Sequence, residues 1–175
     1  IYYNERQMEN TTDSDSGASI RDGVKTINKF GVCPEKSWPY DIDKFTVKPN
    51  DNCYKEAKNH ISVSYKKLEQ TLFDMKCCLS EGYPFIFGFT VFESFESDNI
   101  SKTGIMSMPI DNESSLGGHA VMAVGYDNEK QTFIVRNSWG SSWGDNGYFY
   151  MTYQYIINSD LCDDFWTIRK VLDVN

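Results

Sequence analysis

The residues best suited to proton transfer near neutral pH are the two histidines, His60 and His119. His60 lies in a polar stretch, Lys58-Asn-His-Ile61, which is typical of a surface residue. His119 follows Gly117-Gly118, where the backbone can be approached closely, and it opens the apolar run Ala-Val-Met-Ala-Val. A strand over that run would hold the imidazole in place. Because a lone histidine at a strand start is more often structural, His119 alone does not establish a catalytic site.

A second candidate group follows the next apolar segment. Residues 132–136 run into Asn137-Ser-Trp-Gly-Ser-Ser-Trp-Gly144, and residues 127–130 predict a hairpin turn before them. With that turn, position 126 opposes 131 and position 120 opposes 137, which brings Asn137 beside His119. The amide oxygen can then accept the imidazole N–H and orient the ring, while the tryptophans exclude water. Alternatively, this segment is a glycine-rich turn with aromatic packing.

Both segments resemble the histidine and asparagine motifs of the papain and cathepsin family of cysteine proteases. The first reads Gly118-His-Ala-Val with Val124-Gly-Tyr, and the second reads Arg136-Asn-Ser-Trp-Gly-Ser-Ser-Trp-Gly-Asp-Asn-Gly-Tyr148. Upstream, Asp15-Ser-Gly17 and Trp38-Pro-Tyr40 resemble that family's substrate-binding glycine and its Tyr-Pro-Tyr segment. Residues 84–91 resemble its first barrel strand, so the resemblance runs from about residue 15 to the C-terminus.

The resemblance implies a role for each matching residue. His119 would be the general base and acid, and Asn137 would orient it. Trp139 would shield their hydrogen bond, and Trp143 would border the leaving-group side. The implied substrate-binding residues offer backbone groups to an extended peptide or line the pocket for the second residue before the cut: Ser16, Gly17, Gly88, Gly118, Ala120, Trp166 and Thr167.

The nucleophile of such an enzyme does not appear in the chain. In the family it lies in a Gln…Cys-Gly-Ser-Cys-Trp-like motif, about 130–150 residues before the histidine and asparagine. Counting back from His119 reaches a point before Ile1, and the glutamine of the oxyanion hole is missing with the motif. The five cysteines are poor substitutes, because they lie in a loop, at a helix end and before the last strand: Cys33, Cys53, Cys77, Cys78 and Cys162.

The cysteines also bear on covalent structure. Cys33 and Cys53 flank a loop and can close a disulfide, while the odd total leaves at least one thiol unpaired within the chain. Cys162 matches a disulfide position of the family, but its partner would fall near Glu113, so we expect that bridge to be absent.

Two explanations account for the missing nucleophile. Either it lies upstream of Ile1 or on a light chain, or the protein is an inactive homologue that binds peptides or proteins. We expect the first, because the four residues that serve the site are present: His119, Asn137, Trp139 and Trp143. The resemblance then implies hydrolysis of polypeptides through an acyl-thioester, endopeptidase rather than exopeptidase action, and an inhibitory propeptide. A third reading, in which both motifs only brace a barrel, predicts that His119 is dispensable.

Composition disfavours other classes of partner. The chain of 175 residues is 40% hydrophobic and 15% aromatic, which suffices for a packed core, and its net charge of −8 with no basic block gives nucleic acid no electrostatic support. No apolar run approaches the roughly 18 residues of a membrane span. Two distant histidines make no ligand cluster, so we predict neither a metal nor an organic cofactor.

The order of elements predicts the fold. Residues 13–16 signal a helix start, and Ile20, Val24 and Ile27 recur at helical spacing before Gly31. Residues 32–60 read as a loop and 65–81 as a second helix, followed by strands at 85–91, 119–126, 132–136, 147–153 and 165–172. We therefore expect an α+β, papain-like fold. It comprises a partial helical left domain (1–83) and an antiparallel β-barrel right domain (84–175) that carries His119 and Asn137, with the active-site cleft between them.

Overall fold

A computed structural model describes residues 1–173 of the chain and divides the chain into two compact units. The first unit contains residues 1–66 together with the end of the last strand, from Ile168 onward. The second unit contains Lys67–Thr167, and with it both candidate catalytic residues.

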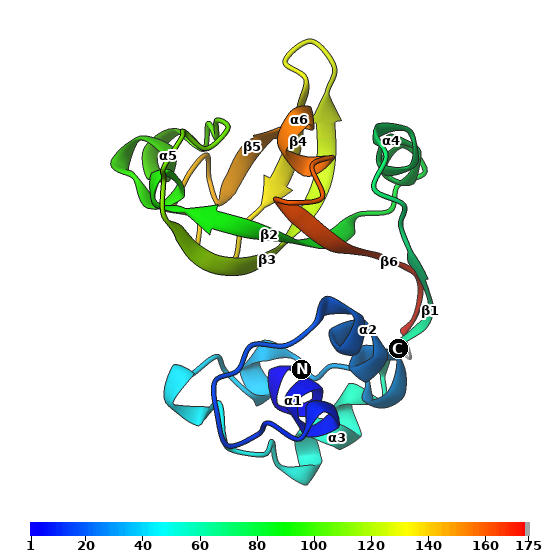
Figure 1. The fold of residues 1–175 in the computed structure, drawn as a ribbon. Helices are drawn as coiled ribbons and strands as arrows, with labels where there is room; N and C mark the ends of the chain where they lie inside the picture. The colour runs from blue at the N-terminus through cyan, green and yellow to red at the C-terminus, as the bar shows by residue number, and fades with distance from the viewer. Residues whose placement is uncertain (174–175) are drawn as a thin grey trace. The chain divides into compact units, whose positions relative to one another are not determined.

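The first unit is mainly helical and the second is built around strands (Figure 1). The α-helices are α1 (Tyr2–Glu9), α2 (Ile20–Phe30), α3 (Asp51–Ala57), α4 (Leu72–Ser80), α5 (Asp98–Thr103) and α6 (Tyr153–Ile156). The 3-10 helices are η1 (Glu35–Ser37), η2 (Ile42–Lys44) and η3 (Glu93–Glu96). The strands are β1 (His60–Lys67), β2 (Phe85–Phe92), β3 (Ser115–Asp127), β4 (Thr132–Arg136), β5 (Tyr148–Thr152) and β6 (Cys162–Asp173).

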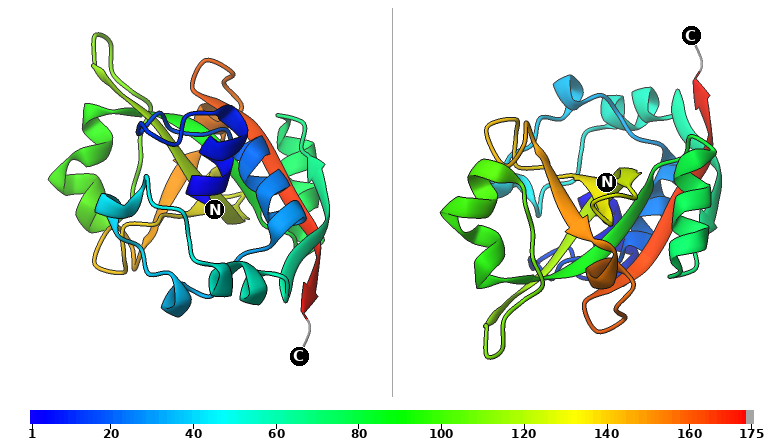
Figure 2. Two further views of the ribbon diagram at one scale, coloured as in Figure 1. Left: turned by 90° about the horizontal axis from the view of Figure 1, so that it is seen from below. Right: turned by 90° about the horizontal axis from the view of Figure 1, so that it is seen from above.

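The strands form one sheet in the order β1-β6-β2-β3-β4-β5, and the pairs from β6 through β5 are antiparallel. β2 and β3 lie side by side along their length, with α4 and α5 at opposite ends of β2 (Figures 1 and 2). The expected closed barrel is not formed by the described residues, because β1 and β5 are edge strands that do not pair with each other.

Helix α2 forms where sequence periodicity predicts it, and its ends explain why. The side chain of Ser19, rather than residues 13–16, caps the first turn by accepting a hydrogen bond from the N–H of Asp22. Gly31 ends the helix with φ +77°, a conformation that glycine adopts without strain. Helix α1 packs against α2, and neither α1 nor α3 was predicted (Figure 2).

A buried arginine organises the loop that leads from α1 to Gly17. The guanidinium of Arg6 donates to the carbonyl oxygens of Thr12 (3.1 Å) and Ser14 (2.8 Å), and also to that of Phe45. The ring of Tyr2 lies against it, with its centroid 4.1 Å from the guanidinium carbon. Because the side chain is fully buried, these carbonyl groups take the place of water around its charge.

The predicted helix over 65–81 is wrong in its first half. Residues 60–67 form β1, and α4 begins only at Leu72, after the Thr71 side chain accepts a hydrogen bond from the N–H of Asp74. The intervening residues make long-range bonds instead of helical ones. The N–H of Leu68 donates to Phe165, and the side chain of Gln70 donates to the carbonyls of Ile156 and Cys162.

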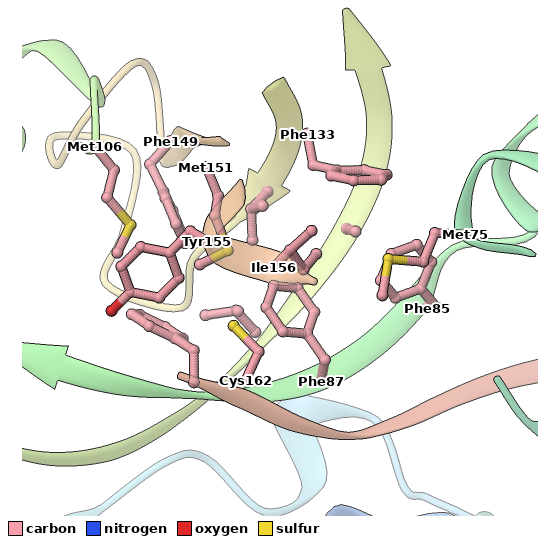
Figure 3. Packing of buried hydrophobic residues seen from close by; sticks show 14 of the residues in the cluster. Met75, Phe85, Phe87, Met106, Phe133, Phe149, Met151, Tyr155, Ile156 and Cys162 are labelled. Atoms are coloured by element: carbon pink, nitrogen blue, oxygen red, sulfur yellow. The ribbon is translucent and has the colours of Figure 1, made fainter. Parts of the chain in front are cut away.

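The core of the second unit lies on one face of β2. Alternate side chains of that strand are buried, and they pack with residues from β4, β5, α4 and α6 (Figure 3). The labelled members of this cluster are Met75, Phe85, Phe87, Met106, Phe133, Phe149, Met151, Tyr155, Ile156 and Cys162. Phe89 continues the same alternation and pairs with His119 in the β2–β3 register, so the core strand sets the position of the histidine.

Candidate active site

His119 lies on β3 between two aromatic rings. The indole of Trp139 stacks on the imidazole with 5.1 Å between ring centroids and 27° between ring planes. The ring of Phe89 meets the imidazole edge to face at 5.8 Å. Gly117, two residues before it, has φ +129°, and a Cβ built on Gly118 would meet nothing within 4 Å.

Asn137 follows β4 directly, and its side chain contacts the imidazole of His119. Its Oδ1 lies 2.8 Å from Nε2 of His119 and accepts a second hydrogen bond of 2.8 Å from the backbone N–H of Ser138. Since a backbone N–H can only donate, the shared atom must be the amide oxygen. The imidazole therefore contributes an N–H at Nε2, which leaves Nδ1 as the acceptor in the neutral ring. No hydrogen bond from the described residues is recorded at Nδ1.

The hairpin register lies one to two residues from the approximate prediction, and the two side chains meet. Tyr126 opposes Phe133, rather than residue 131, so the turn lies further along the chain than predicted. Gln131 has φ +53° in that turn. An irregularity between Ala123 and Gly125 then shifts the pairing by one residue, which leaves Met122 opposite Arg136.

Glycines shape the turn that follows Asn137. Gly140, Gly144 and Gly147 all have positive φ, which is the conformation that favours glycine. The turn closes through the N–H of Asn137, which donates to the carbonyl of Gly147 at 2.9 Å. Trp139 and Trp143 are thereby brought edge to face, with 5.2 Å between their centroids.

The environment of Asn137 is dry but incompletely bonded. The side chain is 7% exposed, and its Nδ2 is buried with no hydrogen-bond partner among the described residues. A buried amide N–H₂ without a partner costs about 1–3 kcal/mol. Orienting the oxygen of this side chain toward the imidazole therefore lowers the free energy of unfolding.

The two cysteines of the second unit that are fully buried are poor nucleophiles. Cys162 and His119 pair with opposite edges of β2 at Phe89, so their backbones are about 10 Å apart. Burial raises the pKa of the Cys162 thiol well above its ordinary value, which disfavours the reactive thiolate. The Cys78 thiol donates to the carbonyl of Tyr83 (3.3 Å).

The two cysteines of the predicted disulfide are free thiols, and they are neighbours. The pKa of Cys33 is raised, first by burial and then by the proximity of Cys53. Cys53 lies on α3, is 3% exposed, and its Sγ is 3.4 Å from the carbonyl oxygen of Ser37.

The structure places the residues that the resemblance assigns to the substrate pocket in different surroundings. Gly88 and Ala120 oppose each other on β2 and β3, one position from the pair that contains His119. Thr167 is fully buried and donates to the carbonyl of Pro84 at 2.8 Å, so its side chain belongs to the core. The indole N–H of Trp166 donates to Asp164 at 2.6 Å.

Ser16 and Gly17 lie in the first unit, on the loop that Arg6 organises. Gly17 has φ +72°, and a Cβ built on it would meet nothing within 4 Å. Its N–H donates to the hydroxyl of Tyr2 at 3.1 Å, and its carbonyl accepts from the Ser16 hydroxyl at 3.2 Å.

Residues 1–173 contain neither a cluster of metal-binding side chains nor a membrane-spanning helix. Within that range, no three His, Cys, Asp or Glu side chains gather where they could hold a metal ion. None of the helices in that range has the length and apolar character needed to cross a bilayer.

Comparison with known proteins identifies the family of the chain. The model of the papain family cysteine proteases matches residues 6–163. An uncharacterised peptidase C1-like protein, L477, of Acanthamoeba polyphaga mimivirus is 52% identical over 99% of this chain. The chain spans 58% of that relative's length.

Solved structures of cysteine proteases share the fold. Xylellain, a cysteine protease from Xylella fastidiosa, aligns with a TM-score of 0.88 and 45% identity, covering 97% of this chain and 68% of xylellain. ProCathepsin B S9 from Trypanosoma congolense aligns with a TM-score of 0.68 at 20% identity, covering 90% of this chain and 55% of that protein, which shows the fold alone. The α+β, papain-like fold is thus confirmed, and the chain belongs to the papain family of cysteine proteases.

Proposed function

We propose that the protein containing this chain is a cysteine peptidase that hydrolyses peptide bonds through a thiolate–imidazolium pair. The nucleophilic cysteine would lie on a segment upstream of Ile1 or on a light chain. The observation that carries the proposal is the 2.8 Å contact between Nε2 of His119 and Oδ1 of Asn137. Because Nε2 is used in this contact, Nδ1 is the ring nitrogen that can exchange a proton with a thiol.

The tautomer of His119 determines what it can do. With a proton on Nε2, the lone pair of Nδ1 can accept the proton of a thiol, and the resulting imidazolium keeps its Nε2–H bond to Asn137. A hydrogen bond to a charged donor is stronger than one to a neutral donor, so Asn137 stabilises the ion pair more than the neutral pair.

The reaction then follows from the position of that proton. The thiolate attacks the peptide carbonyl, and the imidazolium donates its Nδ1 proton to the leaving amine as the carbon–nitrogen bond breaks. An acyl-thioester remains. Nδ1 of His119 next removes a proton from water, whose oxygen attacks the thioester, and the proton returns to the thiolate as the acid product leaves.

Trp139 supports the ion pair in a different way. Its ring covers one face of the imidazole, and the Asn137 side chain beside it is almost completely buried. Excluding water strengthens the hydrogen bond between the two residues, since the local dielectric constant falls. The indole face also attracts a cation, which favours the imidazolium over the neutral ring.

We further propose endopeptidase action on polypeptides and control by an inhibitory propeptide. The propeptide is supported by the likeness in fold to a procathepsin. A series of peptides with free and blocked termini would test the endopeptidase proposal, because an exopeptidase requires a free terminus near the cleaved bond. Cleavage of interior bonds in doubly blocked peptides is the expected result.

The first experiment is to label the complete gene product with a peptidyl epoxide that alkylates active-site thiols. Mass spectrometry should place the adduct on a cysteine outside residues 1–175. The His119→Ala variant should lose the adduct, whereas His60→Ala, which changes the other histidine of the chain, should keep it. No adduct on folded, reduced protein would overturn the proposal in favour of a peptide-binding homologue. Unchanged labelling of His119→Ala would overturn the role of His119.

A further inference from the structure

Phe95 lies in a polar segment but is almost completely buried. It belongs to η3, in the 92–116 connection between β2 and β3, where most neighbours are serine, aspartate, asparagine and glutamate. Its side chain is 1% exposed and joins the core of the second unit. This connection therefore delivers one large aromatic ring to the protein interior close to the active site.

The ring of Phe95 contacts both aromatic neighbours of His119. It meets Phe89 edge to face with 5.1 Å between centroids and 74° between planes. It meets Trp139 edge to face at 5.5 Å and 62°. Phe89 and Trp139 both contact the imidazole, so Phe95 packs against both of these neighbours of His119.

The Phe95 ring also contacts the aromatic residues that pack around Trp139. Phe95 lies 5.3 Å from Trp143 and 5.1 Å from Phe149, measured between centroids. Trp143 in turn contacts both Trp139 and Phe149. Because edge-to-face pairs have preferred angles, a cluster that shares one central ring resists rotation of each member more than isolated pairs would.

The backbone fastens the connection to the turn that carries Trp139. The N–H of Gly144 donates to the carbonyl of Ser101 at 2.7 Å, and the N–H of Tyr150 donates to the carbonyl of Gly104 at 2.8 Å. A Cβ on Gly104 would lie 2.6 Å from the carbonyl oxygen of Tyr148, so no larger residue permits this approach. These contacts tie the connection that carries Phe95 to the segment between Trp139 and β5.

We propose that Phe95 is a positioning residue for His119, acting through Phe89 and Trp139. The inference rests on the proposed peptidase function, since it concerns the geometry of the same imidazole. Phe95 does not touch the imidazole in any recorded ring contact. Its effect is to fix the two rings that set the plane of the imidazole, and with it the direction of Nδ1.

The alternative is that Phe95 serves only to fill the core. Phe133 provides the matched comparison, because it is fully buried in the same core. Its recorded ring contacts are with Phe85, Tyr126 and Tyr153, and none is with His119 or Trp139. A residue that only fills the core should behave like Phe133 when it is replaced.

The test compares Phe95→Leu with Phe133→Leu in the complete gene product. Peptide hydrolysis gives kcat and KM, and nitrogen-correlated NMR of the imidazoles reports the environment of His119. The His119 signal is identified by its loss in His119→Ala, and the chain contains only one other histidine. Should Phe95→Leu fail to fold, Phe95→Met takes its place, because it fills the volume with a flexible chain.

We expect Phe95→Leu to lower kcat by about 10- to 100-fold, because misalignment of about 1 Å has effects of this size. KM should stay within about threefold, and the His119 ring signals should move as the Trp139 ring shifts. Phe133→Leu should leave both readouts near their original values at a similar loss of thermal stability. Equal behaviour of the two variants would overturn the inference. A parent protein without turnover would overturn the proposed function instead, and the NMR comparison would then decide the positioning role alone.

Discussion

The change Asn137→Ala should separate catalysis from stability. It removes the acceptor of the imidazole N–H, which lies at 2.8 Å in a nearly water-free site. In the ion pair that donor is charged, and hydrogen bonds to charged groups contribute about 1.5–3 kcal/mol. Since about 1.4 kcal/mol corresponds to a factor of ten, kcat/KM should fall by about 10- to 150-fold.

The free energy of unfolding should change far less. The substitution removes the buried Nδ2, whose unmet hydrogen bond costs about 1–3 kcal/mol, and so it relieves that cost. The N–H of Ser138 loses its acceptor, but Ser138 is exposed and can donate to water instead. These effects oppose each other, so we expect a net change within about 1 kcal/mol.

The assay pairs hydrolysis of a fluorogenic peptide with urea unfolding of the same preparations. Asn146→Gly is the control, because it removes an exposed side-chain amide from the same turn at a residue whose φ of +54° suits glycine. The control should keep the parent rate. A fall in kcat/KM smaller than threefold for Asn137→Ala would refute the orienting role. An unfolding loss above about 3 kcal/mol would show that the residue is chiefly structural.

Three further predictions concern the first unit. Arg6→Lys keeps the charge but loses the forked donors that bind three carbonyls, so it should lower the free energy of unfolding by about 2–4 kcal/mol. Limited proteolysis should then cleave residues 10–17 more readily. The control Arg21→Lys should change neither the free energy of unfolding nor the cleavage. Burial raises the pKa of Glu5 to about 7, above its usual 4.5, so the protonated form of this side chain favours folding. The free energy of unfolding should therefore fall as pH rises from about 4.5 to 7. Glu5→Gln should abolish that pH dependence when unfolding is measured across this range. Oxidised glutathione should link Cys33 to Cys53 by disulfide exchange. The reaction should become faster as pH rises, because the raised pKa of Cys33 keeps it mostly in the unreactive thiol form at neutral pH. Peptide mapping that finds only mixed disulfides with glutathione would contradict the pairing.

Local signals in the sequence sufficed for the elements whose partners are close in the chain. Helix α2 carries its own cap at Ser19 and its own stop at Gly31, and β2 shows its alternation of buried side chains without help from elsewhere. The hairpin of β3 and β4 is also local, so the meeting of His119 and Asn137 could be foreseen from the motifs. Its exact register could not, because Gly125 adjoins the irregularity but does not fix how the pairing shifts, and the positive φ of Gln131 has no glycine to signal it.

Other features depend on partners that are distant in the chain. The apolar stripe that suggested a helix from residue 65 includes Leu68, whose N–H bonds instead to Phe165, about a hundred residues later. In the sequence Arg6 lies in a polar stretch typical of a surface, and only the structure shows the carbonyl groups that surround it. Phe95 shows a weak signal, a lone aromatic among polar residues, but its role depends on rings from three other segments.

The division of the chain into units has a consequence for its synthesis on the ribosome. The second unit is one continuous stretch, Lys67–Thr167, and all its parts exist once residue 167 has left the exit tunnel. The first unit contains residues 1–66 but also needs the end of β6, from Ile168, so it is completed only after the whole of the second unit has been made. Domains usually fold in the order in which they are made. Here the unit that carries His119 can fold before the unit that contains residues 1–66 is complete.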